Sequence, residues 1–123
     1  MGEADTACHA HKGKTKRTEV LYRDAGTLYV YLCYGMHWLM NVVVAQPGEP
    51  QCVLMRAGIG ANGPGLFTRA LKIDGSLNGV CATASNEIWF EAGAPCPIEE
   101  MPRVGIAYAD PADRNQLWRF VMK

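Results

Sequence analysis

Apolar residues occur in runs that polar or glycine-containing segments separate. Residues 27–33 and 37–45 are rich in valine, leucine, tyrosine and tryptophan, as is typical of strands buried on both faces. Between them stand Tyr34, Gly35 and Met36, and Gly35 is the only glycine in 27–44. Two such runs joined by a short glycine-containing connection predict a β-hairpin.

The remaining runs predict one helix and several strands. Residues 66–73 have apolar side chains at helical spacing, and Pro64 can open this helix. Strands are expected at 51–57, 87–93, 103–109 and 117–122, and irregular or connecting segments at 1–18, 58–65 and 94–102. The pattern predicts an α+β fold, a single domain over residues 1–123, mainly antiparallel β-sheet with a protruding hairpin and few short helices.

The charges are balanced overall but unevenly placed. Twelve basic and twelve acidic residues give a formal net charge of zero, so bulk charge predicts no polyanion partner. Residues 12–23 nevertheless hold five cations against Glu19 alone, whereas 87–113 is strongly acidic. On charge alone, the basic segment is either a solvated loop, which is favoured, or a phosphate-binding site.

Five cysteines without a CxxC motif indicate free thiols rather than a disulfide framework. Cys33 and Cys52 lie in apolar runs and are expected to be buried thiols in a reducing compartment. Cys8, His9 and His11 could bind a metal, but no second cluster completes four ligands, so no metal is expected.

A membrane location is not expected. No signal peptide is recognised, and the apolar run 28–45, although nearly long enough to span a bilayer, contains Gly35, His37 and Asn41. The expectation is a cytoplasmic monomer, associated with the nucleoid if the protein is bacterial.

The predicted hairpin carries more polar-tipped side chains than a core needs. If its turn centres on Met36, Tyr31 faces Asn41 across the strands, so a flat ring and an amide share one face. Tyr34 and Met36 would project from the tip, where apolar side chains can wedge between DNA bases. Such a pocket suits a flipped base. From these residues alone, a tyrosine-rich core hairpin with a buried, hydrogen-bonded Asn41 is the favoured alternative.

Several longer motifs identify a family. "ACHAHKGKTKR", "GTLYVYLCYGMHWLMN", "CVLMRAG", "NGPG" before "LFTRALKID", "RVGIAYA" and "WRF" occur in the order found in the alkyladenine (3-methyladenine) DNA glycosylase family, which the chain resembles over nearly its whole length. The resemblance implies a base-excision repair enzyme that needs no cofactor. It would flip alkylated purines (3-methyladenine, 7-methylguanine, or also hypoxanthine or ethenoadenine) out of double-stranded DNA and hydrolyse the N-glycosidic bond.

The resemblance also implies roles for individual residues. Tyr34 would be the intercalating wedge, with Met36 beside it, and the base pocket would contain His9, Tyr31 and Asn41, with Tyr31 stacking on the base. Arg56 and the backbone carbonyl of Val104 would hold the attacking water. The DNA backbone would be contacted by Lys14, Thr15, Arg17 and His37.

The sequence departs from the family pattern in three places. The family's general base, a glutamate in an "ETEAY"-like strand, would align before Met1, which implies a truncated, miniature member. The basic insertion usual after "RAG" is reduced to "IGA", and Leu66 stands where a lysine follows "NGPG".

The departures leave the general base open. Glu3, Asp5 or His11 could replace the glutamate, or Glu3 and Asp5 could belong to a solvated N-terminus. The alternative functions are a lesion-binding protein that lacks catalysis and a small basic-loop fold with an unrelated ligand.

Overall fold

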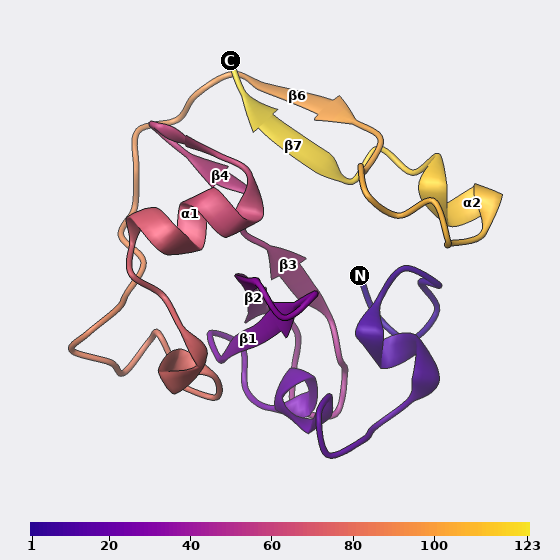
Figure 1. The fold of residues 1–123 in the computed structure, drawn as a ribbon, viewed down its shortest axis with the longest axis horizontal. Coiled ribbons are helices and arrows are strands. Elements are labelled where there is room, and N and C mark those ends of the chain that lie inside the picture. Colours follow the sequence, from indigo (N-terminus) through magenta and orange to yellow (C-terminus); the bar gives the residue numbers. More distant parts are fainter.

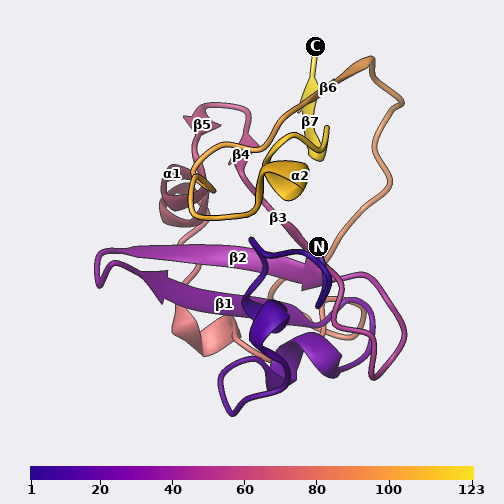
Figure 2. The ribbon, with the colours of Figure 1, turned by 90° about the vertical axis from the view of Figure 1, so that its right-hand side faces the viewer.

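The computed structural model describes residues 1–123 as one α+β fold of short elements (Figures 1 and 2). Three short 3-10 helices and two α-helices accompany seven strands. In chain order the elements are η1 (His9–Lys12), η2 (Glu19–Tyr22), β1 (Leu28–Cys33), β2 (His37–Val43), β3 (Cys52–Leu54), β4 (Ala57–Gly58), β5 (Ala61–Asn62), α1 (Pro64–Ala70), η3 (Gly75–Leu77), β6 (Ile98–Met101), α2 (Pro111–Arg114) and β7 (Arg119–Met122). The expected fold class, a mainly antiparallel α+β fold with a hairpin and few short helices, is confirmed.

The central sheet has the order β1-β2-β3 and is antiparallel throughout. The predicted hairpin is confirmed, and its tip protrudes from the rest of the molecule in Figure 2. The predicted register is wrong by two residues, since Tyr29 faces Asn41 and Tyr31 faces Leu39. Because side chains alternate with a period of two, this shift leaves Tyr31 and Asn41 on one face as diagonal neighbours.

The turn geometry explains the shift in register. The pairing of Cys33 with His37 centres the turn on Gly35 rather than Met36. The amide of Met36 donates to the carbonyl of Cys33 at 3.1 Å. Both central residues have positive φ, 50° at Tyr34 and 65° at Gly35, as in the type I′ turns that suit twisted hairpins.

Two buried clusters lie on the two faces of the sheet. On one face the N-terminal helices η1 and η2 bring Cys8, Ala10, Val20 and Leu21 against Tyr29, Val43 and Cys52. On the other face Ile73 and Ala82 pack against Leu28, Val30, Met40 and Val42. The alternation of side chains along β1 and β2 therefore anchors a different segment on each face.

Helix α1 begins at Pro64, as the sequence predicts, but it ends at Ala70, before the expected boundary at residue 73. The expected loop 58–65 contains β5 and part of β4, because Ala57 pairs with Asn62 and Gly58 with Ala61. The predicted strand 51–57 is only three residues long, as β3.

The C-terminal third differs most from the prediction. Residues 87–93 and 103–109 form no strands, so both predictions are wrong. The β-propensity of 87–93 finds no partner strand, and Gly105 bends the second segment with a φ of 77°. The strand predicted at 117–122 is confirmed as β7, and its partner β6 lies inside the expected connector 94–102. In Figure 1 this two-stranded ribbon lies apart from the central sheet.

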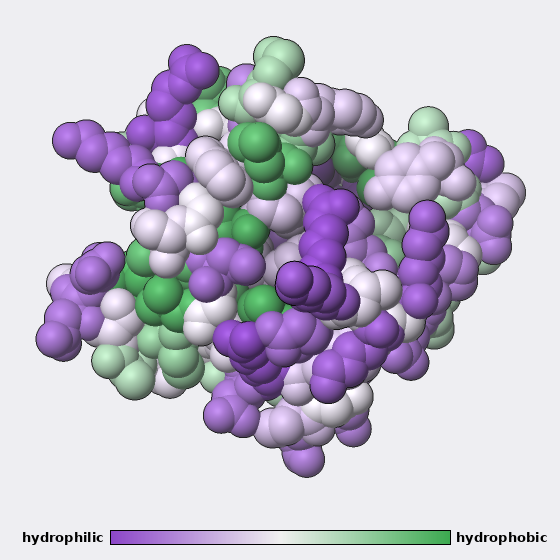
Figure 3. Space-filling model, turned by 60° about the horizontal axis from the view of Figure 1, so that its bottom comes forward, coloured by the Kyte–Doolittle hydropathy of each residue, from purple (hydrophilic) through white to green (hydrophobic).

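The surface mixes both kinds of side chain. On the face drawn in Figure 3, hydrophobic residues show in several places, on the left, at the upper middle and on the right, with hydrophilic side chains between and around them. No helix of the structure has the length and apolar character that crossing a membrane requires.

Candidate active site

The tip of the β1–β2 hairpin presents two large side chains to solvent, as the sequence predicts. Tyr34 is 94% exposed and Met36 is 72% exposed. The hairpin hydrogen bonds hold the backbone beneath them. Their role as a wedge stays a prediction, but the geometry it needs, a ring held clear of the protein on a firm support, is present.

Below the tip, one face of the hairpin carries a cluster of three rings. Helix η1 places His9 with its ring centroid 4.6 Å from that of Tyr31 and 5.9 Å from that of Tyr29. Tyr29 and Tyr31 lie 5.3 Å apart, and Nδ1 of His9 is hydrogen-bonded to the hydroxyl of Tyr29 at 2.9 Å. The structure thus brings together His9 and Tyr31, which the sequence assigned to one pocket.

Tyr29 is the member of this cluster that sequence reasoning missed. It is buried, and its hydroxyl holds the ring of His9. The signal that could have found it is the two-residue spacing from Tyr31, which places both rings on one face of a strand.

The cluster is uncharged near neutral pH. Burial, reinforced by the nearby cations Arg17 and Lys12, lowers the pKa of His9 below its usual 6.5. Burial also raises the pKa of both Tyr29 and Tyr31. Neutral rings are suited to stacking against a flat base.

Asn41 lies beneath the rings rather than at an open wall. Its side chain is buried, and Nδ2 donates to the backbone carbonyl of Tyr29 at 3.3 Å. The thiol of Cys52 approaches Oδ1 at 4.0 Å. The role of Asn41 in testing the edge of a purine stays a prediction, and it requires that the side-chain amide become accessible to the flipped base.

Arg56 and Val104, assigned together to the attacking water, are brought together by the structure. Nη1 of Arg56 donates to the carbonyl oxygen of Val104 at 3.3 Å, across 48 residues of sequence. Burial and the neighbouring Arg119 lower the pKa of Arg56, but an arginine at neutral pH keeps its charge. The pair can orient a water molecule by donating and accepting hydrogen bonds, but it cannot remove a proton from it.

Asp5 does not belong to a solvated N-terminus, and this interpretation of it is wrong. Its carboxylate forms a two-point ion pair with Arg103, at 2.6 and 3.0 Å, and the side chains of Asp5 and Arg103 are only 2% and 7% exposed. Oδ1 of Asp5 also accepts from the amide of Ala7 at 3.0 Å. Because this carboxylate is buried and already accepts three hydrogen bonds, the geometry argues against Asp5 as the general base.

Glu3 is exposed, but it is also engaged. The hydroxyl of Tyr22 donates to its carboxylate at 2.5 Å, and burial together with this carboxylate raises the pKa of Tyr22 to about 12. The ring of His11 donates to the backbone carbonyl of Glu3 at 2.9 Å. All three candidate replacements for the base therefore have partners of their own.

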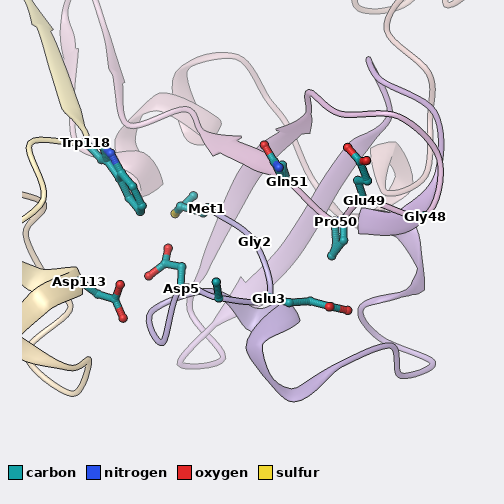
Figure 4. Close-up of a pocket in the computed structure, with 11 residues that line it drawn as sticks. Met1, Gly2, Glu3, Asp5, Gly48, Glu49, Pro50, Gln51, Asp113 and Trp118 are labelled. Carbon is teal, nitrogen blue, oxygen red and sulfur yellow. The ribbon is translucent and has the colours of Figure 1, made fainter.

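The N-terminal segment borders a cavity of about 510 Å³ (Figure 4). Asp5, Asp113 and Trp118 lie on one side of it, and Glu49 and Pro50 lie on the other. The carboxylate of Glu3 points away from the side that Asp5 occupies.

A network that no local sequence signal reveals ties this segment to the C-terminal third. The amide of Thr6 donates to the carboxylate of Asp113 at 3.0 Å, and its hydroxyl is bonded to the same group. Tyr108 donates to the carbonyl of Ala7 at 3.1 Å. Together with the Asp5–Arg103 pair, these bonds fix the chain just before His9 against the segment that begins at Val104.

Of the basic residues assigned to phosphates, Arg17 lies beside the ring cluster and Lys14 lies beside Tyr22. The guanidinium of Arg17 stands 5.4 Å from the ring centroid of Tyr31, and Nζ of Lys14 stands 5.5 Å from that of Tyr22. Thr15 shares hydrogen bonds with Thr18. These cations form no ion pair, so their charges remain available to an anion.

All five cysteines are free thiols. Cys52 and Cys8 are buried, whereas Cys33 is only half-buried, contrary to the expectation for that residue. No group of three histidine, cysteine or acidic side chains gathers in a way that could hold a metal ion.

Comparison with known proteins adds an independent result. The family model of methylpurine-DNA glycosylase matches residues 1–60 and 59–123. Proteins named "Putative 3-methyladenine DNA glycosylase" from Borreliella burgdorferi and Legionella pneumophila are each 40% identical to the chain. Both alignments cover the whole chain, and they cover 74% and 72% of the length of those two proteins. A protein of the same name from Psychrobacter cryohalolentis is 36% identical, over 98% of the chain and 69% of its own length. The chain therefore belongs to the methylpurine-DNA glycosylase family.

Proposed function

We propose that this protein is a monofunctional DNA glycosylase of base excision repair. It would bind double-stranded DNA, flip an alkylated purine such as 3-methyladenine or 7-methylguanine, and hydrolyse its N-glycosidic bond. Family membership and the names of the relatives support the class of activity. The choice of lesion, and a cytoplasmic or nucleoid-associated monomer as the working form, remain part of the proposal.

One observation carries the proposal: a single hairpin bears both an exposed ring and a ring-lined cluster. Tyr34 projects from the tip, and the same hairpin holds Tyr31 beside His9 on one face. A wedge that fills the gap in the duplex and a stacking surface for the displaced base are the two parts that base flipping requires. Arg17 adds a cation beside this surface.

The proposed reaction replaces one bond by another at the sugar. The oxygen of a water that hydrogen-bonds to both Arg56 and the carbonyl of Val104 forms a bond to C1′, while the bond from C1′ to the purine nitrogen breaks. The electron pair of that bond leaves with the purine, so a purine that was positively charged departs as a neutral base, and the proton of the attacking water passes to bulk solvent. Stacking by Tyr31 would hold the base so that the sugar meets the water.

A second candidate, a lesion-binding protein without catalysis, is favoured by a different observation. The two carboxylates closest in sequence to His9 are engaged, Asp5 by Arg103 and Glu3 by Tyr22. Neither is free to act as general base in this arrangement. General base catalysis is typically worth about 10²–10⁴-fold, so its loss would leave binding intact and slow the chemistry.

The test is a duplex that carries one lesion, incubated with excess protein and analysed for abasic sites. The proposed enzyme makes abasic product, whereas the lesion-binding protein binds the lesion duplex without product. A protein that does neither refutes both candidates.

Two variants test the wedge. Tyr34→Ala should weaken binding to lesion duplexes about tenfold or more, since stacking on an aromatic ring is worth about 1–3 kcal/mol per base. Tyr34→Asn is the matched variant, because asparagine tolerates the positive φ at this position while it also lacks the ring. If both variants fold and bind as tightly as the parent, the wedge role is wrong.

A further inference from the structure

A second hollow lies directly beside the hairpin tip. It has a volume of about 350 Å³ and is bounded by the ends of β1 and β2 and by the first turns of α1. Its lining is mostly apolar and contains no acidic residue, and it includes Tyr34, His37, Leu39, Pro64, Leu66 and Arg69. We call this hollow the tip groove.

The tip groove is built from elements that are locked together. The ring of His37 packs so closely on Gly65 that an added Cβ would lie 3.1 Å from it. The buried hydroxyl of Thr68 donates to the carbonyl of Trp38 at 2.6 Å. Helix α1 is thereby held against β2, which brings the two walls of the tip groove together.

Arg69 is the one permanent charge of the tip groove. It lies one helical turn after Leu66, so the two side chains share a face of α1. Arg69 is exposed and forms neither an ion pair nor a side-chain hydrogen bond, since the ion pairs of the protein are Arg23–Glu19 and Arg103–Asp5. An unpaired guanidinium at the rim of an acid-free apolar groove is suited to a phosphate attached to an apolar group.

We propose that the tip groove binds the deoxyribose-phosphate backbone of DNA next to the flipped nucleotide. The apolar wall around Leu66 would contact the sugar, and Arg69 would bind the phosphate. Because Tyr34 lines the same groove, the phosphate contact would fix how far along the duplex the wedge enters. This inference rests on the proposed function, since it takes Tyr34 as the wedge.

The first test is the salt dependence of binding to an undamaged duplex. Each phosphate contact contributes about 0.9 to the slope of log affinity against log salt concentration. Arg69→Gln should therefore reduce the slope by about one. Arg114→Gln is the matched control, because Arg114 is also an exposed, unpaired arginine on a short helix, and α1 and α2 lie on opposite sides of Figure 1. Equal slopes for Arg69→Gln and the parent would overturn the inference.

The second test locates the phosphate. A neutral methylphosphonate is placed at one linkage at a time around the lesion, and the affinity of the parent and of Arg69→Gln is measured for each duplex. At one linkage near the lesion, the methylphosphonate should lower the affinity of the parent about tenfold, which is the size of a charged hydrogen bond. The same methylphosphonate should leave the affinity of Arg69→Gln unchanged. If every linkage weakens both proteins equally, Arg69 contacts no phosphate and the inference is wrong.

The outcomes separate this inference from the proposed function. If the protein makes abasic product, but each methylphosphonate lowers the affinity of the parent and of Arg69→Gln equally, only the tip-groove inference is overturned. Absence of product and of lesion preference would overturn the proposed function, while a lower slope for Arg69→Gln would still support the tip groove as a DNA site.

Discussion

Replacing Asp5 by asparagine should destabilise the fold by about 3 kcal/mol. The substitution keeps the size of the side chain but removes its charge from a pair whose members are only 2% and 7% exposed. The guanidinium of Arg103 then stays buried without a counter-ion, and breaking a buried pair in this way costs about 3–5 kcal/mol.

The structure indicates where in that range each variant should fall. Asparagine still offers an oxygen to Arg103, which also donates to the backbone carbonyl of Asp113 at 3.0 Å, so Asp5→Asn belongs at the lower end. Asp5→Ala also removes the acceptor of the Ala7 amide and belongs nearer about 5 kcal/mol. At about 4 °C per kcal/mol for a domain of this size, the midpoint of thermal unfolding should fall by about 12 °C and about 20 °C.

Urea unfolding of the parent and variants measures these losses, and the chain contains its own control. The second ion pair, Arg23 with Glu19, has side chains that are 47% and 38% exposed. Glu19→Gln should therefore cost between 0 and about 1 kcal/mol. The double variant Asp5→Leu with Arg103→Met removes both buried charges and should be more stable than Asp5→Asn.

A loss below about 1 kcal/mol for Asp5→Asn, equal to that of Glu19→Gln, would refute the reasoning. It would mean that water reaches the Asp5–Arg103 pair and that the N-terminal segment is not clamped as described. A double variant less stable than Asp5→Asn would refute the claim that the unpaired buried charge, rather than the lost shape of the side chain, causes the destabilisation.

The remaining predictions concern pH, salt and packing. Burial lowers the pKa of His9 below 6.5, so near that pH the folded protein binds fewer protons than the unfolded chain. The free energy of unfolding should therefore fall as the pH drops below about 6.5. The fall should be smaller in His9→Gln, and urea titrations at several pH values would measure it. Replacing Lys14 and Arg17 by glutamine should flatten the slope of log DNA affinity against log salt by about two or less; an unchanged slope would make the basic segment a solvated loop. Gly65→Ala should destabilise α1 against β2, because the new methyl group meets the ring of His37 at 3.1 Å, and a calorimetric scan would detect it.

The hairpin could be predicted from sequence because its signals are local. Valine, leucine, tyrosine and tryptophan make up most of both strands, and a glycine stands between the strands. The register could not be read equally well, because a turn centred on Gly35 or on Met36 satisfies the same apolar pattern. The positive φ of Tyr34 decides between them, and it is unusual for a residue other than glycine, asparagine or aspartate.

The C-terminal third could not be predicted because its strands depend on partners rather than on composition. Residues 87–93 have suitable strand formers but no neighbour to pair with, whereas Glu99 and Glu100 enter a strand because β7 lies beside them. The Asp5–Arg103 pair joins residues 98 positions apart, and neither has a local signature. The roles of the candidate site residues could be predicted only from the resemblance of the motifs to a known family. The part played by Tyr29 and the hydrogen bond that engages the carboxylate of Glu3 are visible only in the structure.

The engagement of Glu3 leads to a final prediction about lesion choice. A purine methylated at N3 or N7 carries a positive charge, so its glycosidic bond breaks with little help, whereas hypoxanthine is neutral and depends on an activated water. Arg56 can orient that water but stays protonated, and Tyr22 holds the carboxylate of Glu3 at 2.5 Å. Single-turnover release should therefore be fast for 7-methylguanine and 3-methyladenine and slow for hypoxanthine.

Tyr22→Phe, which frees the carboxylate, should speed hypoxanthine release if Glu3 can serve as the base. Glu3→Gln in the Tyr22→Phe background should then slow hypoxanthine release again, by about 10² or more. Rapid hypoxanthine release by the parent that Glu3→Gln does not slow would show that another group activates the water.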